Sequence, residues 1–369
     1  MEDSDHDQRV ARALHHPGAQ PTGAPLTPPL VLTTAYVLPG DPAGDYQYAR
    51  WANPTWTALD EALARLEDAP VVTFPSGMAA IAAVFYGLLK TGDRVLLPAD
   101  GYYTTRILAE RFLAPMGVAF DLVATAALDA RSFDGYRLVL IETPSNPALD
   151  LADIRAVSAR AKAAGSIVAV DNTMMTPLGQ RPLDLGADLL VSADTKAVNG
   201  HSDVLFGHVA SREATLLDAV RDWRRIAGSI PGPFEAWLVH RGIETLELRF
   251  ARMCESALVL AQRLQGHRAV RSVVYPGLAG HPAHQLARRQ MRGYGSIVGV
   301  TLAGKAAAEG FIGGCRFVRA ATSFGGLHTS AERRARWGDQ VPEGFVRLSV
   351  GCEPVGALWH DIEQALDAL

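Results

Sequence analysis

Short apolar runs alternate with segments of helical spacing over the first part of the chain. The apolar runs have the length and the β-branched content of buried strands, and they fall at residues 71–74, 94–98, 118–123, 138–142, 167–170 and 189–191. Helical spacing predicts helices at residues 56–66, 77–90, 104–114, 151–164 and 212–225. Elements that alternate in this way imply right-handed crossovers and a mainly parallel central sheet of the α/β class.

The rest of the chain predicts a second, smaller α/β domain. Helical spacing is nearly unbroken from Phe234 to Leu264, with Glu244, Glu247 and Arg249 on polar faces, which suits a helix that bridges two domains. Strands follow at 270–275 and 296–302, and an amphipathic helix closes the chain at 356–368. Residues 1–48 are rich in Pro, Gly and Thr and predict an extended arm. We therefore expect an arm (1–48), a large domain (49–240) and a C-terminal domain (241–369).

Composition and charge exclude several classes of function. The chain has 369 residues and a net charge of −4, which offers no basic face for nucleic acid. Its three cysteines are widely spaced and predict reduced thiols, with neither a zinc site nor a disulfide framework. The uncharged stretch 71–89 is interrupted by Pro75 and Gly77, so a strand, a turn and a helix explain it better than a membrane span. The acidic N-terminus is unlike a secretory signal, and we expect a cytoplasmic protein.

Two charged residues follow neighbouring strands of the predicted sheet. Asp171 ends the apolar run at 167–170, and Lys196 lies shortly after the run at 189–191. Ligands of parallel sheets bind at the carboxyl ends of the strands, so both side chains could face one pocket. An amine for a Schiff base and a carboxylate for a pyridinium nitrogen are what a pyridoxal phosphate site needs. The alternative is an ordinary surface ion pair.

The residues around Asp171 and Lys196 resemble those of the Cys/Met-metabolism pyridoxal phosphate enzymes, the trans-sulfuration family. The matching motifs are Asp-Asn-Thr at 171–173, Gln-Arg-Pro-Leu at 180–183, Thr195-Lys196 and Gly-His-Ser-Asp at 200–203. The resemblance implies the fold-type I, aspartate aminotransferase-like architecture. It also implies cofactor contacts from Asp171, Thr173, Thr195 and Lys196. The family serine three residues before the lysine is Ala193 here, so Ser192 is the candidate for that phosphate contact.

Further cofactor contacts are implied by motifs that lie earlier in the chain. In Tyr-x-Arg-x-x-Asn-Pro-Thr, Tyr48 and Arg50 take the places of residues that reach the cofactor phosphate of a partner subunit, which implies a homo-oligomer, a dimer of dimers. A Ser-Gly-Met-Ala turn opens the predicted helix at 77–90, and its Gly77 and Met78 are expected to cradle the phosphate. Tyr102, with Tyr103 as its rival, is expected to stack on the pyridine ring. Asn146 is expected to donate a hydrogen bond to the phenolate oxygen of the cofactor.

The substrate site is implied by two motifs near the C-terminus. Arg347, in Ile-Arg-Leu-Ser-like sequence, is expected to grip the substrate carboxylate, and Ser323 to border it; an arginine inside an apolar strand needs a partner in any case. His328 stands where γ-lyase relatives carry a glutamate, and it is a candidate for the distal end of the substrate. We expect γ-elimination on a sulfur amino acid, like that of cystathionine γ-lyase. The alternatives are a γ-synthase and a catalytically silent oligomer, while the missing GxGxxG fingerprint disfavours a Rossmann dehydrogenase.

Overall fold

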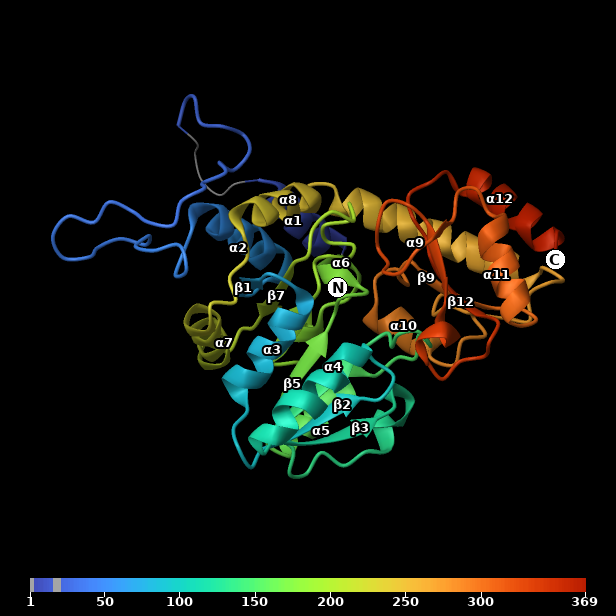
Figure 1. Cartoon of the computed structure of the whole chain (residues 1–369), viewed down its shortest axis with the longest axis horizontal. Coiled ribbons are helices and arrows are strands. Elements are labelled where there is room, and N and C mark those ends of the chain that lie inside the picture. Colours follow the sequence, from blue (N-terminus) through green and yellow to red (C-terminus); the bar gives the residue numbers. More distant parts are fainter. Residues whose placement is uncertain (1–2, 16–20) are drawn as a thin grey trace.

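A computed structural model describes residues 3–15 and 21–369 (Figure 1). In this part of the chain seven strands form the larger sheet. Their spatial order is β1 (Val71–Phe74), β7 (Gly207–Ala210), β6 (Leu189–Ser192), β5 (Ile167–Asp171), β4 (Leu138–Glu142), β2 (Arg94–Pro98) and β3 (Ala119–Val123). All pairs from β6 to β3 are parallel, whereas β7 runs antiparallel to both of its neighbours. The prediction of a mainly parallel sheet is therefore confirmed, and β7 is the strand that it missed.

Both faces of the larger sheet are covered, because alternate residues of a strand point to opposite sides. In β4, Leu138 and Leu140 belong to one apolar cluster with the helices α3 (Gly77–Leu88) and α7 (Ala214–Ala227). The intervening Val139 and Ile141 pack on the other side with α5 (Ile154–Ala163). A strand that is apolar on both faces is thus explained by helices on both faces. The expected helices at 77–90, 151–164 and 212–225 form with ends shifted by at most three residues.

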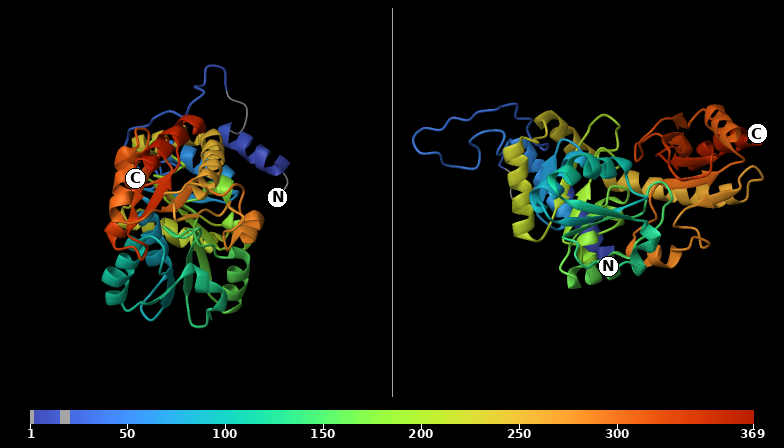
Figure 2. Two further views of the ribbon diagram at one scale, coloured as in Figure 1. Left: turned by 90° about the vertical axis from the view of Figure 1, so that its right-hand side faces the viewer. Right: turned by 60° about the horizontal axis from the view of Figure 1, so that its bottom comes forward.

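A second sheet follows in the C-terminal part of the chain and lies beside the first (Figure 2). Its order is β10 (Arg319–Ala320), β11 (Ser330–Arg333), β12 (Phe345–Ser349), β9 (Ile297–Thr301) and β8 (Ser272–Val274). Three helices pack on it around one apolar cluster: α9 (Leu246–Gln265), α11 (Lys305–Gly314) and α12 (Val355–Asp367). In Figure 1, α9 runs from the larger sheet to the smaller one. The arm, large domain and C-terminal domain that we divided at residues 48 and 240 remain a proposal.

The remaining helices are short or lie at the edges of the larger sheet. They are α1 (Asp3–Leu14), α2 (Pro54–Glu67), α4 (Tyr103–Leu108), the π-helix η1 (Ala109–Leu113), the 3-10 helices η2 (Ala114–Met116), η3 (Thr125–Ala130), η4 (Pro182–Leu185) and η5 (Arg334–Trp337), α6 (Thr176–Gly179), α8 (Pro233–Ile243) and α10 (His284–Gln290). All three cysteines are free. Among the described residues there is no helix with the length and apolar character needed to cross a membrane.

The expected extended arm at 1–48 is only partly extended. Residues 3–14 form α1, where His6 and Ala13 are buried and Val10 packs against the cluster that includes α2. The helix was missed because a sequence so rich in charge shows only a narrow apolar stripe, and packing on α2 supplies the rest of its stability. Residues 21–50 have the expected extended character and leave the body as a long loop (Figure 1).

The predicted unbroken helix from 234 to 264 is wrong at one point. It divides into α8, which ends at Ile243, and α9, which begins at Leu246. Arg249 was placed on a polar face, but its side chain is buried and fills the break. Its guanidinium donates to the Gly242 carbonyl at 2.6 Å and to the Thr245 hydroxyl at 3.0 Å. The Gly242 carbonyl at the end of α8 thereby gains a charged donor besides the Thr245 N–H, which lies 3.3 Å away.

Candidate active site

One pocket of about 400 Å³ lies where the carboxyl ends of the central strands meet the second sheet. This is the size and position expected of a small-molecule site in an open α/β sheet. It is lined by these residues singled out from the sequence: Gly77, Met78, Tyr102, Tyr103, Asn146, Asp171, Thr173, Thr195, Lys196, Ser323 and Arg347. The prediction that Asp171 and Lys196 face one pocket is confirmed.

Lys196 occupies the centre of the site. Its Nζ donates to the Ser323 hydroxyl at 2.7 Å and lies 4.9 Å from the centre of the Phe324 ring. Burial, together with the positive charge of Arg347, lowers the pKa of Lys196 to about 8. An appreciable fraction of the amine is therefore neutral and nucleophilic near neutral pH. The chain has only four lysines, and Lys90, Lys162 and Lys305 are all exposed.

The loop that carries Lys196 is held by the break between α8 and α9. Arg249 Nη1 donates to the Ala197 carbonyl at 2.7 Å, and Nη2 donates to the Val198 carbonyl at 3.1 Å. Gly200 has a φ of +77°, and a Cβ at this position would collide with the Arg249 guanidinium. Arg249 was not predicted as a site residue, because a charged residue in a helical pattern gave no sign of burial. Its contacts make it a positioning residue for Lys196.

Two carboxylates lie side by side at the ends of β4 and β5. Glu142 and Asp171 are paired in register across these parallel strands, and both line the pocket. Burial, reinforced by the charge of Asp171, raises the pKa of Glu142 well above its usual range, although the Tyr102 N–H donates to it at 2.6 Å. Burial also raises the pKa of Asp171, but the side chain and N–H of Thr173 and the charge of Lys196 oppose this shift. Glu142 therefore takes up the first proton, and Asp171 keeps the negative charge.

The opposite end of the pocket suits an anion. Helix α3 begins at Gly77, after Ser76, whose Oγ accepts the Ala79 N–H at 3.1 Å. The first N–H groups of a helix have no partner inside the helix and favour a negative group. A Cβ at Gly77 would lie 2.5 Å from the Cβ of Ala193, so only glycine fits at this turn. Thr195 also lines this part of the pocket, and its hydroxyl accepts the Phe206 N–H at 2.9 Å. The Ser76 hydroxyl can thus donate to a phosphate, whereas the Thr195 hydroxyl donates to the Phe206 carbonyl at 3.2 Å and would have to turn to reach one.

Ser192, expected to be a phosphate contact, lies outside the pocket. Its neighbours Val191 and Ala193 line the pocket, so the alternation at the end of β6 turns Ser192 to the other side. There its hydroxyl donates to Asp194 at 3.0 Å, and it is only 2% exposed. The family serine position is filled by an alanine whose N–H donates to the Thr173 hydroxyl at 2.8 Å.

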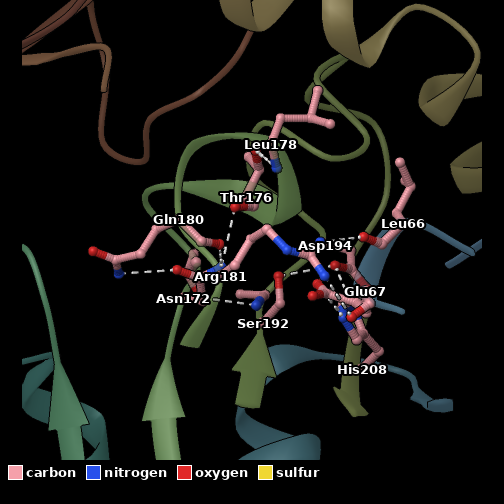
Figure 3. A network of polar contacts seen from close by, with 12 residues as sticks. Leu66, Glu67, Asn172, Thr176, Leu178, Gln180, Arg181, Ser192, Asp194 and His208 are labelled. Carbon is pink, nitrogen blue, oxygen red and sulfur yellow. Dashed lines mark hydrogen bonds and ion pairs between the residues drawn. The ribbon is translucent and has the colours of Figure 1, made fainter. Parts of the chain in front are cut away.

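Ser192 belongs instead to a buried polar network beneath the Lys196 loop (Figure 3). His208 places Nδ1 2.8 Å from Asp194 and Nε2 3.3 Å from Glu67. Burial alone would lower the pKa of His208, but the two carboxylates outweigh it and raise this pKa to about 10. A protonated histidine between two acids ties α2, the Lys196 loop and β7 together. On the other side of Figure 3, the Asn172 side chain donates to the Gln180 carbonyl at 2.9 Å and holds the turn after Asp171.

The second sheet supplies the remaining wall of the pocket. Arg347 on β12 is 4% exposed and donates to Asn146 Oδ1 at 2.8 Å, to the Ser323 carbonyl at 3.2 Å and to Glu332 at 3.0 Å. The amide oxygen of Asn146 is therefore engaged, and its NH₂ group stays available as a donor. Ser323 adopts a φ of +77°, which is uncommon outside glycine and typical of functional sites. This backbone turns its hydroxyl to Lys196 and its carbonyl to Arg347.

Besides Ser192, three residues singled out from the sequence are not brought to this pocket. His328 is exposed and does not line it, so the structure contradicts the expectation that it borders the substrate within its own chain. Tyr48 and Arg50 lie near the end of the segment 21–50, and Arg50 donates to the Arg225 carbonyl at 2.8 Å. Their expected contact is with a partner subunit, and it stays a prediction. Tyr102 and Tyr103 are 41% and 46% exposed and both line the pocket, so the choice between them stays open.

A lysine at the centre, an acid at one end and an anion site at the other define a fold-type I pyridoxal phosphate enzyme. The chain belongs to the family of Cys/Met metabolism PLP-dependent enzymes, whose model matches residues 12–367. Membership of this family excludes two of the alternatives raised by the sequence, a catalytically silent oligomer and a Rossmann dehydrogenase.

Individual relatives span several activities. A Streptomyces coelicolor protein with the provisional name cystathionine gamma-lyase is 48% identical over 93% of this chain and 89% of its own length. The L-methionine gamma-lyase of Pseudomonas deceptionensis is 38% identical, covering 97% of both chains. Structures of cystathionine gamma-synthase from Xanthomonas oryzae, with aminoacrylate and cysteine or with cystathionine, match with a TM-score of 0.91. They are 35% identical and cover 100% of this chain and 98% of theirs.

We expect the exposed position of His328 to show in kinetics. Substituting alanine for this residue should change kcat/KM by less than about twofold for any substrate, because surface substitutions away from a site have small effects. Initial rates for cystathionine and for methionine measure this directly. A rise of tenfold or more in the Michaelis constant for either substrate would contradict this prediction and indicate that His328 contacts the substrate.

Proposed function

We propose that this enzyme carries out γ-elimination on a sulfur-containing or otherwise γ-substituted amino acid, like cystathionine γ-lyase, and releases a thiol, a 2-oxo acid and ammonia. The observation that carries the proposal is that Lys196, Asp171 and Arg347 line one pocket together. The 48% identity to the Streptomyces coelicolor protein supports the γ-lyase assignment.

Each of these residues has a distinct task in the proposed reaction. Arg347 binds the α-carboxylate of the substrate, because its planar fork matches two carboxylate oxygens. Lys196, with its lowered pKa, takes the proton from Cα and returns protons along the carbon chain. Asp171 keeps its negative charge next to the ring nitrogen, since Glu142 takes up the first proton. Pyridoxal phosphate, when bound, supplies the electron sink that stabilises negative charge at Cα.

A second candidate is γ-replacement of the cystathionine γ-synthase type on an activated homoserine. It is favoured by the structures of the Xanthomonas oryzae enzyme, which match over the whole chain. The two reactions use the same lysine and differ in the fate of the unsaturated product, which is either released as a 2-oxo acid or captured by a thiol.

The deciding experiment is a substrate panel with product identification. Cystathionine, methionine, homocysteine, O-acetyl-L-homoserine and O-succinyl-L-homoserine are each supplied with and without cysteine. A γ-lyase forms a 2-oxo acid and ammonia from cystathionine without a second substrate. A γ-synthase instead forms cystathionine from an acylated homoserine and cysteine, and this outcome would contradict the first proposal.

We further propose a homo-oligomer in which Arg50 reaches the cofactor phosphate of a partner subunit. Arg50→Ala should then weaken cofactor binding by about 10- to 100-fold, because a charge-assisted contact contributes about 1.5–3 kcal/mol. The loss should grow on dilution, as the subunits separate. Cofactor retained after gel filtration at several protein concentrations is the measurement.

Arg225→Ala provides the matched control for this prediction. It removes an equal charge from the same surface but keeps the backbone carbonyl that Arg50 binds. Its guanidinium also lies near the Trp51 ring, at 5.3 Å, as that of Arg50 does at 5.8 Å. Equal loss of cofactor in both variants, or a fully active monomer, would refute the shared site.

A further inference from the structure

The wall of the pocket contributed by the second sheet carries an arginine and a tryptophan that the proposed reaction does not use. Arg334 and Trp337 belong to η5 and line the same pocket as Lys196. Arg334 is 7% exposed, whereas Trp337 is 56% exposed. The wall therefore runs from a buried guanidinium to an indole at the solvent edge. None of the motifs that carry the family resemblance falls in the stretch 330–340.

Glu332 connects this wall to the carboxylate-binding arginine. Its Oε2 accepts from Arg334 at 2.8 Å and from Arg347 at 3.0 Å, while its Oε1 accepts from Arg336 at 2.9 Å and from the Trp337 indole at 2.5 Å. Glu332 is 1% exposed, so these are strong contacts in a water-poor setting. Because Arg334 and Arg347 share one oxygen of Glu332, its negative charge neutralises the positive charge of each arginine only in part.

Arg334 is held rigidly and keeps donors to spare. On its outer side Asp339 Oδ2 accepts from Nε and from Nη2, both at 2.7 Å. A guanidinium has five N–H groups, and its contacts with the described residues occupy three of them. The two that remain belong to a side chain that lines the pocket. Buried guanidinium N–H groups are costly unless an acceptor meets them, and a carboxylate is the acceptor that their fork fits.

We propose that Arg334, flanked by Trp337, forms a subsite for a carboxylate at the far end of the substrate side chain. The inference rests on the proposed function, in which Arg347 binds the α-carboxylate of the same substrate. It assigns the enzyme to γ-substituted amino acids whose side chain ends in a carboxylate, such as cystathionine or O-succinyl-L-homoserine. Amino acids with a short apolar side chain, such as methionine, leave these N–H groups unpaired.

The test uses two esters, of which only one carries a terminal carboxylate; the other also lacks the methylene group next to it. O-succinyl-L-homoserine carries it, and O-acetyl-L-homoserine lacks it. With pyridoxal phosphate-loaded protein, Arg334→Gln should lower kcat/KM for the succinyl ester by about 10- to 100-fold more than for the acetyl ester, the size of a lost charge-assisted contact. Arg334→Lys should restore part of the preference, because it keeps the charge and loses the fork.

The matched control is Arg336→Gln. Arg336 also donates to Glu332, but it does not line the pocket. A general disturbance of Glu332 and Arg347 should lower kcat/KM for both esters by the same factor. Arg336→Gln should show this pattern. If Arg334→Gln lowers kcat/KM equally for both esters, or for neither, the proposed subsite is overturned. Thermal unfolding of the three variants reports whether any has lost the fold, in which case Arg334→Lys decides.

A binding measurement separates failure of the subsite from failure of the proposed function. L-2-aminosuberate and L-2-aminooctanoate have the same chain length, end in a carboxylate and a methyl group, and have no γ-leaving group. The distal carboxylate of 2-aminosuberate lies as many atoms from Cα as that of cystathionine. Calorimetry on the wild-type protein should show tighter binding of 2-aminosuberate, and Arg334→Gln should abolish the difference. If neither ester nor cystathionine is turned over but this preference holds, the proposed function is wrong and the subsite stands. Equal binding of the two ligands by the wild type would overturn the subsite.

Discussion

Replacing Lys196 by alanine should lower kcat/KM by about 10³-fold or more, because the same amine anchors the cofactor and moves protons at the reacting carbons. The variant should also lose the visible absorbance of the cofactor-loaded protein. The fold should persist, since the change removes a buried amine that hydrogen-bonds to a single hydroxyl among the described residues, that of Ser323. Initial rates with cystathionine at saturating pyridoxal phosphate, visible spectra and thermal unfolding measure the three effects.

The small number of lysines makes the assignment of Lys196 easy to check. After borohydride reduction of the loaded wild-type protein, peptide mapping should find the cofactor on Lys196 and on none of the three exposed lysines. Lys90→Ala, which removes an exposed amine, should behave as the wild type. A Lys196→Ala protein that keeps its activity with the cofactor fixed on another lysine would contradict the assignment.

Replacing Asp171 by asparagine should lower kcat by about 10²- to 10³-fold, the usual size of a lost electrostatic contact to developing charge. The substitution keeps the shape and the acceptor for the Thr173 N–H, which lies 3.0 Å from Oδ1, and removes only the negative charge. Loss of this charge should also weaken the retention of the cofactor. Single-turnover rates and cofactor content after dialysis give both values.

Glu142→Gln is the control for Asp171→Asn, since the two acids lie side by side on β4 and β5. The raised pKa of Glu142 favours the neutral form of its side chain, and glutamine has nearly the same shape as that form. It can still accept the Tyr102 N–H. We therefore expect Glu142→Gln to change kcat by less than about tenfold. If Glu142→Gln lowers kcat as much as Asp171→Asn does, the assignment of the negative charge to Asp171 is contradicted.

Much of the site could be predicted from the sequence because it lies at the ends of strands. The period of the apolar residues identifies the strands, and in a parallel sheet their carboxyl ends must meet at one edge. This places Asp171 and Lys196 together without knowledge of any side-chain contact. Glu142 could have been found by the same reasoning, because it also ends a buried strand next to that of Asp171. The Ser-Gly turn before α3 was recognisable because a glycine between a strand and a helix exposes the first N–H groups of the helix to an anion.

Other assignments failed where the direction of one side chain decides the outcome. Ser192 and Ala193 are neighbours, but the pleat at the end of β6 sends the serine into the His208 network and the alanine to the pocket. His328 was placed by a motif, yet the turn after Ser323 leaves it in solvent. Arg249 looked like a surface residue in a helix, and it is buried in the helix break. A one-residue difference in register changes the side to which a side chain points, and motif spacing does not fix this.

The sequence by itself determined the α/β class, the mainly parallel sheet, the cofactor and the two residues at the centre of the site. The class, the sheet and the meeting of the two residues follow from local periodicity and from rules of sheet topology that hold for any chain of this pattern. The cofactor was implied by the motifs that resemble the pyridoxal phosphate family. Only the tertiary structure decided which side chains surround Lys196 and which oxygens Glu332 presents to its four donors. Those contacts join segments far apart in the chain, such as Asn146 and Arg347, and they depend on how the two sheets pack together. Packing between distant segments leaves no periodic trace in the sequence.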